Sequence, residues 1–424
     1  MASSEPDKKP DIEAVSTDRG ESASLMEPLV LSEGSRHRTV LIDLAIELAQ
    51  RSAGFRRSLP ASLVSSLATL VRSMNCYYSN LIEGHDTHPV DIERALQGDY
   101  SQEPKKRDLQ VEAKAHIGVQ QWIDDGALSG RTVTLEAIRE IHRRFCEALP
   151  EDLLWVDDPV THERMQVIPG EWRTRDVKVG THIPVSAPAI PRFLQRFEQV
   201  YSRQGKTETI LAAAAAHHRL VWIHPFLDGN GRVARLMSHA TLLEALDTGA
   251  VWSVARGLAR NVAAYKGHLA ACDQTRRNDL DGRGNLSEEA LAEFTGFFLQ
   301  TCLDQIVFME GLMQPDSLRA RILVWAEEEI RLDRLPPKSG AVLEAVLYRG
   351  ELPRADIAGI VGTGDRQARR IVAALTEHDV LVSESSRAPL RLAFPAALAA
   401  RWMPGLFPPQ DIRITPGAGA LTFN

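Results

Sequence analysis

The sequence predicts a mainly α-helical protein with one short β-hairpin near its middle and a winged helix-turn-helix domain near its end. Two observations predict the helices and the hairpin. Apolar residues recur at spacings of three and four over most of the chain, which is the pattern of amphipathic helices. Residues 151–190 break this pattern, because Pro, Gly and Thr are frequent there and Arg175 to His182 alternate in polarity.

The composition is that of a soluble globular protein. Of the 424 residues, 44% are hydrophobic and 25% are charged. The net charge of −7 does not suggest nucleic acid as a partner of the whole chain, although a local basic face stays possible. The four cysteines form no C-x-x-C pair, which is typical of a reduced, cytoplasmic protein. No apolar run approaches the roughly 18 residues of a membrane span.

The chain divides into five expected segments. Residues rich in Ser, Glu, Asp and Pro begin it, and we expect them to be disordered. A Pro- and Gly-containing stretch at 335–340 indicates a linker before the last domain. The predicted segments are a disordered tail (1–35), an N-terminal helical region (36–150), a core (151–333), a winged helix-turn-helix (338–405) and a loose tail (406–424).

Three helices are expected before the core. Leu63, Leu67, Leu70 and Met74 recur at helical spacing, and this helix should stop at Gly84, since glycine is favoured just past a helix end. Further helices are expected at 108–124 and 135–148. Inside the core, residues 210–223 contain five consecutive alanines, which are strong helix formers.

The most informative stretch is HPFLDGNGRVAR, from His224 to Arg235, which lies between two predicted helices. Gly229-Asn230-Gly231 allows a sharp turn and a close approach to a ligand. The turn leads into a helix whose first amides can bind an anion. Arg232 and Arg235 are three positions apart, so both can reach phosphate oxygens from one face of that helix.

Two further side chains complete this candidate site. Asp228 precedes the turn and could hold Mg²⁺ that bridges phosphates. His224 closes the preceding helix, where a neutral imidazole could take a proton from a hydroxyl. A His before Pro is usually structural, and Phe226 is interpreted as a packing anchor. However, two arginines at a helix N-terminus oppose the helix dipole unless an anion compensates.

The run from His224 to Arg235 matches H-P-F-x-[D/E]-G-N-G-R-x-x-R, so the chain resembles the Fic family, over roughly residues 36–330. The resemblance implies a Fic-type helical core that transfers AMP from ATP to a Ser, Thr or Tyr hydroxyl of a target protein and releases pyrophosphate. It assigns the base to His224 and Mg²⁺ binding to Asp228. It assigns phosphate binding to Gly229, Asn230, Gly231, Arg232 and Arg235.

The resemblance also implies contacts outside this run. One stretch resembles the family's flap, which borders the nucleotide and pins the target backbone by strand addition, although an ordinary surface turn is the alternative. The flap residues are Val179, Gly180, Thr181 and His182. Tyr265 would lie against the adenine, whereas a lone tyrosine is more often part of a core. Asp273 stands where some relatives carry Asn, which leaves the base and ribose contacts open.

Ser79, Glu83 and Gly84 match the family's inhibitory pattern [S/T]-x-x-x-E-[G/N]. This match implies that Glu83 pairs with Arg235 and withholds it from the γ-phosphate, so that ATP binds in a non-productive pose. Breaking such a partly buried pair costs on the order of a few kcal/mol. A helix-end carboxylate that faces water is the alternative interpretation of Glu83.

Residues 354–360 and 365–377 are predicted to be two short helices around a Gly-containing turn, and short strands at 381–383 and 390–392 could flank a wing. This arrangement resembles the winged helix-turn-helix found behind the Fic core in several bacterial relatives. Its second helix carries Arg366, Arg369 and Arg370, which could contact DNA. A protein-interaction module of the same shape is the alternative.

Two rival functions use the same residues. Glu83 could position water so that the site removes AMP from a modified protein. Alternatively, the chain could be a DNA-binding regulator whose core only senses nucleotide, in which case His224→Ala would leave its function intact. By analogy with the family we expect a homodimer. The sequence does not indicate the target protein or what relieves inhibition.

Overall fold

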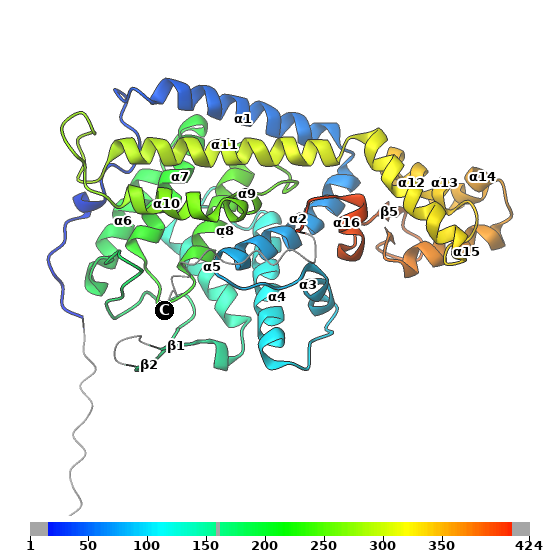
Figure 1. The fold of residues 1–424 in the computed structure, drawn as a ribbon, viewed down its shortest axis with the longest axis horizontal. Coiled ribbons are helices and arrows are strands. Elements are labelled where there is room, and N and C mark those ends of the chain that lie inside the picture. The colour runs from blue at the N-terminus through cyan, green and yellow to red at the C-terminus, as the bar shows by residue number, and fades with distance from the viewer. Residues whose placement is uncertain (1–15, 158–161, 409–424) are drawn as a thin grey trace, which may run out of the picture.

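The computed structural model describes residues 16–157 and 162–408. As predicted, the chain is mainly helical (Figure 1). At the centre, α7 (Lys206–Ile223) packs along α8 (Asn230–Leu246). The alanines at 212–216 are all buried in α7, and their small side chains let neighbouring helices approach closely. This helix pair carries the candidate site in the loop that joins it.

A second layer of long helices covers this pair. In Figure 1, α1 (Arg38–Ser58) and α11 (Glu288–Leu312) run side by side along one edge of the molecule, and both contact α7. The other helices of this region pack around these elements and against one another. They are α3 (Pro89–Leu96), α5 (Leu135–Glu147), α6 (Ile190–Tyr201), α9 (Val254–Arg260) and α10 (Val262–Cys272).

Two N-terminal helices bring further side chains to the central loop. The predicted helix before Gly84 is α2 (Ala61–Ile82), and Gly84 follows with a φ of +89°. The helix expected at 108–124 is α4 (Pro104–Asp124). Both contact α8, and they also contact each other, so residues near their ends can reach the start of α8.

The sheet content of the core differs from the prediction. A two-stranded antiparallel sheet lies earlier than expected, between β1 (Trp155–Asp157) and β2 (Arg164–Gln166), with Val156 opposite Met165. The stretch expected to form a hairpin instead makes one antiparallel bridge, between Val179 and His182. The flap is therefore a tight turn rather than a pair of strands.

The C-terminal unit contains a small sheet packed against helices. After α12 (Pro315–Arg331), it comprises α13 (Ser339–Arg349), β3 (Glu351–Leu352), α14 (Ile357–Val361), α15 (Asp365–Glu377), β4 (Leu381–Val382), β5 (Leu390–Leu392) and α16 (Ala399–Trp402). The three strands are antiparallel in the order β3-β5-β4. Two predicted helices and two predicted strands are present, whereas β3 was not predicted from the sequence.

The sequence predicted that both terminal segments are loose, and this prediction is wrong for the residues that the structure describes. In the N-terminal segment, Met26, Leu29 and Leu31 are buried, because apolar side chains spaced along this polar stretch fill grooves on the core. At the other end Leu406 is buried, and its carbonyl accepts a hydrogen bond of 2.9 Å from the hydroxyl of Tyr78. Residues 1–15 and 409–424 of the predicted tails lie outside the described residues.

Among the helices of the described residues, none combines the length and the apolar character that crossing a bilayer requires.

Candidate active site

The loop between α7 and α8 is held in shape by its own residues. His224 ends α7 in a left-handed conformation with φ of 51°, and Gly229 precedes α8 with φ of 78°. The side chain of Asn230 spans the loop: its Oδ1 accepts from the Phe226 amide and its Nδ2 donates to the Phe226 carbonyl, both at 2.9 Å. Both ends of the Asn230 side-chain amide hold the loop, so the predicted phosphate contact of Asn230 would come from its backbone amide.

Phe226 anchors this loop, as predicted. Its side chain is fully buried and stacks on the imidazole of His142, with ring centroids 3.8 Å apart and planes 7° apart. The indole of Trp172 packs against it at 4.9 Å. In turn, Nδ1 of His142 accepts a hydrogen bond from the Gly170 amide, so the support beneath the loop is itself fixed.

The start of α8 is arranged as an anion site. No side chain among the described residues caps this helix, so its first amides remain available to a ligand. Only Gly229 of the two glycines has a positive φ, whereas Gly231 lies in the first helical turn. Gly231 matters for space: a Cβ there would lie 2.5 Å from Oε1 of Glu83. Glycine at this position therefore lets Glu83 approach the helix.

His224 is oriented by a residue that the sequence analysis missed. The guanidinium of Arg173 is fully buried and donates to the His224 carbonyl at 2.8 Å. It also donates to the carbonyls of Arg175 and Val185, at 2.7 and 2.6 Å, and the Arg173 amide donates to the Pro225 carbonyl at 2.9 Å. Arg173 thus ties both sides of the flap to the residue that ends α7.

The pKa of His224 is strongly perturbed. Burial in the cavity wall, reinforced by the nearby positive charge of Arg173, lowers the pKa of His224 to about 3. The imidazole is therefore neutral at physiological pH and able to accept a proton.

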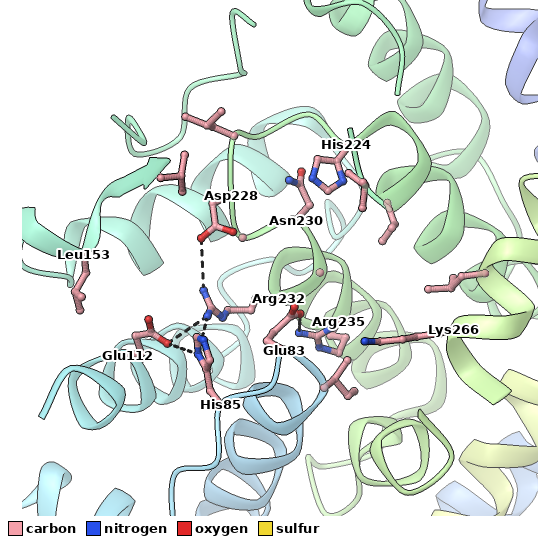
Figure 2. A pocket seen from close by; sticks show the side chains of 18 of the residues that line it. Glu83, His85, Glu112, Leu153, His224, Asp228, Asn230, Arg232, Arg235 and Lys266 are labelled. Atoms are coloured by element: carbon pink, nitrogen blue, oxygen red, sulfur yellow. Dashed lines mark hydrogen bonds and ion pairs between the residues drawn. The ribbon is translucent and has the colours of Figure 1, made fainter. Parts of the chain in front are cut away.

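A cavity of about 480 Å³ gathers most of the predicted site residues (Figure 2). Its predicted lining residues are Glu83, Val179, His224, Asp228, Gly229, Asn230, Gly231, Arg232, Arg235 and Tyr265. Gly180, Thr181 and His182 of the flap are not among the lining residues; Nε2 of His182 lies 2.8 Å from the Trp222 carbonyl. Lys266, from α10, adds a cation that the sequence analysis did not select.

The predicted pair between Glu83 and Arg235 is present. A guanidinium nitrogen of Arg235 contacts Oε1 of Glu83, while its Nε donates to the Ser79 hydroxyl at 2.8 Å. The Arg235 side chain is 3% exposed and that of Glu83 is 23% exposed. Burial opposes ionisation of Glu83, but the charges of Arg235 and Arg232 outweigh it and hold the pKa of Glu83 below its ordinary value. The pair is therefore ionic at neutral pH.

Arg232 has partners that the sequence did not indicate. Its guanidinium lies 3.2 Å from Oε2 of Glu112, on α4, and 3.3 Å from Nδ1 of His85 (Figure 2). Asp228 is exposed and lies 4.0 Å from the same guanidinium. Glu112 occupies an ordinary helical position in the sequence, so only the packing of α4 on α8 reveals this contact.

Tyr265 lies in the cavity wall with its hydroxyl already engaged. The hydroxyl is 2.7 Å from Nε2 of His217, and burial raises the pKa of Tyr265 to about 12. Its ring is thus fixed in place beside the cavity. Asp273, at the C-terminal end of α10, lies 3.0 Å from Nε2 of His218 and is not among the residues that line the cavity.

These features define a helical domain in which the loop before an uncapped helix start carries a neutral histidine. Residues 132–242 match the model of the Fic/DOC family, so this part of the chain is similar to that family. The match begins after α2, so Glu83 lies outside it.

Three known proteins illustrate the likeness. The chain is 28% identical over 225 residues to "Protein adenylyltransferase Fic" of Drosophila erecta, covering 50% of this chain and 42% of that protein. It is 32% identical over 171 residues to the same-named protein of Drosophila mojavensis, covering 40% and 31%. The solved structure of Fic-1 (residues 134–508) from C. elegans is similar with a TM-score of 0.49 and 19% identity, covering 65% of this chain and 74% of that one. The chain spans less than half the length of these curated relatives.

Proposed function

We propose that this chain transfers AMP from ATP to a hydroxyl group of a protein. One observation carries the proposal: the cavity that contains the neutral imidazole of His224 is also lined by the uncapped start of α8 and by two buried arginines. Similarity to proteins named adenylyltransferase agrees with it.

The cavity suits a triphosphate. Arg232 and Arg235 concentrate positive charge at the end of α8 where the helix dipole is also positive. Lys266 lines the same space. Asp228 supplies one exposed carboxylate, and a single carboxylate together with phosphate oxygens is a common way for proteins to hold Mg²⁺. When bound, Mg²⁺ would neutralise charge on the phosphates.

The reaction follows from these positions. The acceptor hydroxyl gives its proton to His224 while its oxygen forms a bond to the α-phosphorus of ATP. The bond between that phosphorus and the oxygen bridging to the β-phosphate breaks, and pyrophosphate leaves. The arginines and helix amides stabilise the charge that develops on the phosphates. Val179 brings the flap backbone to the same cavity, where it would align the acceptor chain.

Glu83 would keep this site inactive. Its carboxylate occupies the guanidinium of Arg235 and lies beside Gly231, in the first turn of α8. A phosphate that needs Arg235 must first displace Glu83, so ATP would bind without the geometry for transfer. The wild-type chain is therefore expected to have low basal activity.

Isotope position tests the proposed reaction directly. With the Glu83→Gly variant, label from α-phosphate-labelled ATP should enter protein, whereas label from γ-phosphate-labelled ATP should not, because only AMP is retained. Denaturing gels and mass spectrometry of the modified protein would measure this. Entry of the γ label would instead identify a kinase and contradict the proposal.

We propose DNA binding as a second function, for the C-terminal unit. Its helix–strand–helix–helix–strand–strand order is that of a winged helix-turn-helix, and Arg366, Arg369 and Arg370 are exposed on α15. Retention on duplex DNA should fall with added salt and weaken in Arg369→Ala, because each lost phosphate contact reduces affinity and its salt dependence. The absence of any retention at low salt would exclude this function.

A further inference from the structure

Residues 16–21, near the N-terminus, contact the segments on either side of the flap, which lie far away from them in the sequence. The flap turn, 179–182, emerges between Asp176 on one side and Pro184 and Ser186 on the other, and we call these two sides the feet of the flap. Arg173 already joins the two feet, because its guanidinium donates to the carbonyls of Arg175 and Val185 and to that of His224.

Residues 16–21 make a second set of contacts to both feet. Ser16 donates to Oδ1 of Asp176 at 2.6 Å, and the same oxygen accepts from the Ala187 amide at 2.9 Å. Arg19 donates to the Pro184 carbonyl at 2.8 Å. Glu21 accepts from both the amide and the hydroxyl of Ser186, at 2.7 and 2.6 Å. The two feet are thus joined through a third segment.

This segment is itself fastened to α6. Arg192 donates to both carboxylate oxygens of Asp18, at 2.6 and 2.7 Å, and to the Glu21 carbonyl at 2.5 Å. The hydrogen bonds from Arg192 lower the pKa of Asp18 to about 2, so the pair stays ionic throughout the neutral range. Further along, Met26 and Leu29 anchor the chain by burial. Arg192 therefore contributes three of the hydrogen bonds that dock residues 16–21, whereas the later residues are held independently.

We propose that residues 16–21 form a clasp that fixes the flap over the catalytic cavity, and that Asp18, Arg19, Glu21 and Arg192 are positioning residues for the acceptor chain. The inference rests on the proposed function for its consequence, because the flap aligns the acceptor hydroxyl with His224. A docked clasp restricts the flap to one position, and release of the clasp leaves its two sides joined only by Arg173 and by the hydrogen bond from the Ala187 amide to Asp176, so the flap opens more easily.

Hydrogen exchange at the flap tests the clasp without any activity measurement. The amides of Val179 and His182 donate the two hydrogen bonds that close the flap turn, at 3.0 and 2.9 Å, so they report its opening. In Arg192→Ala these amides should exchange roughly tenfold faster than in the wild-type chain, because local opening becomes easier. Glu21→Ala should act in the same direction, since it removes both contacts to Ser186.

Arg196→Ala is the matched control. Arg196 lies one turn further along α6 and pairs with Glu27 at 2.7 Å, beyond the clasp, where buried residues keep the chain in place. Flap exchange in this variant should equal that of the wild type. If Arg192→Ala and Glu21→Ala leave exchange at Val179 and His182 unchanged, the clasp does not fix the flap and the inference is wrong.

The functional consequence is measured separately in the Glu83→Gly background. Adding Arg192→Ala should lower label transfer to protein severalfold while the affinity for ATP stays the same, because the clasp contacts the flap feet and not the lining of the cavity. An equal loss of ATP affinity would contradict a positioning role. If Glu83→Gly itself transfers no label, the proposed function fails, while the exchange experiment still decides on the clasp.

Discussion

Replacing Glu83 with glycine should raise the transfer of α-phosphate label to protein at least about tenfold over the wild-type chain. The carboxylate contacts the guanidinium of Arg235, whose side chain is only 3% exposed, and a partly buried pair of this kind costs on the order of a few kcal/mol to break. ATP must meet this cost in the wild type, and a cost of ~1.4 kcal/mol already corresponds to a factor of ten. Removal of Glu83 frees Arg235 for phosphate.

A series of substitutions at Glu83 separates the effect of its charge from the effect of its size. Glu83→Gln keeps a side chain of similar size that still accepts a hydrogen bond from Arg235, so its activity should lie between wild type and Glu83→Gly. Adding His224→Ala to Glu83→Gly should abolish label transfer, since the cavity then lacks its neutral base. Initial rates of label incorporation at saturating ATP would measure all three variants.

The same series addresses the reverse reaction. If Glu83 positions water for AMP removal, the wild-type chain should release AMP from a previously modified protein and Glu83→Gly should not. In that case modified protein would accumulate in Glu83→Gly because AMP removal has stopped, and not because AMP transfer is faster. A Glu83→Gly variant that labels no more than wild type, and a wild type that removes no AMP, would together refute both roles for Glu83.

The parts of the site that could be predicted are those with a local signature. The run from His224 to Arg235 is contiguous, and its turn, helix start and charges follow from residue types alone. The contact between Glu83 and Arg235 was also predicted, although 152 positions separate them, because the pattern around Glu83 resembles a known inhibitory helix.

The residues that the sequence analysis missed have no local signature. Arg173 acts through main-chain carbonyls, which every residue has, so no partner could be identified in the sequence. Glu112 reaches Arg232 only because α4 packs on α8. Residues 16–35 have the polar composition of a disordered tail, but Met26, Leu29 and Leu31 are enough to dock them. Each case depends on tertiary packing rather than on local pattern.

Arg173 gives the second large expected effect. Arg173→Ala leaves the carbonyls of His224, Arg175 and Val185 without their donor in a buried place, and each unsatisfied group costs about 1–3 kcal/mol. We therefore expect the free energy of unfolding to fall by roughly 3 kcal/mol or more. Denaturant unfolding would measure this change.

The catalytic effect of Arg173→Ala should exceed what the loss of stability explains. In the Glu83→Gly background, label transfer should fall at least about 100-fold at a temperature where the variant is still folded, because a misplacement of His224 by about 1 Å is costly. Arg173 is not among the residues that line the nucleotide cavity, so ATP affinity, measured by calorimetry, should change little. A parallel loss of ATP affinity and turnover would indicate general collapse of the site.

Two comparison variants show whether the loss of activity in Arg173→Ala comes from lost geometry or from lost charge. Arg173→Lys keeps the positive charge, but a single ammonium group cannot reproduce the planar arrangement that serves three separated carbonyls, so it should not rescue activity. Arg331→Ala removes an exposed arginine of α12 that pairs with Glu327, and it should change stability by no more than about 0.5 kcal/mol. Full activity in Arg173→Lys would mean that Arg173 acts on His224 through its charge and not by holding the loop. In that case the depressed pKa of His224, to which the charge of Arg173 contributes, would be the property that the arginine controls.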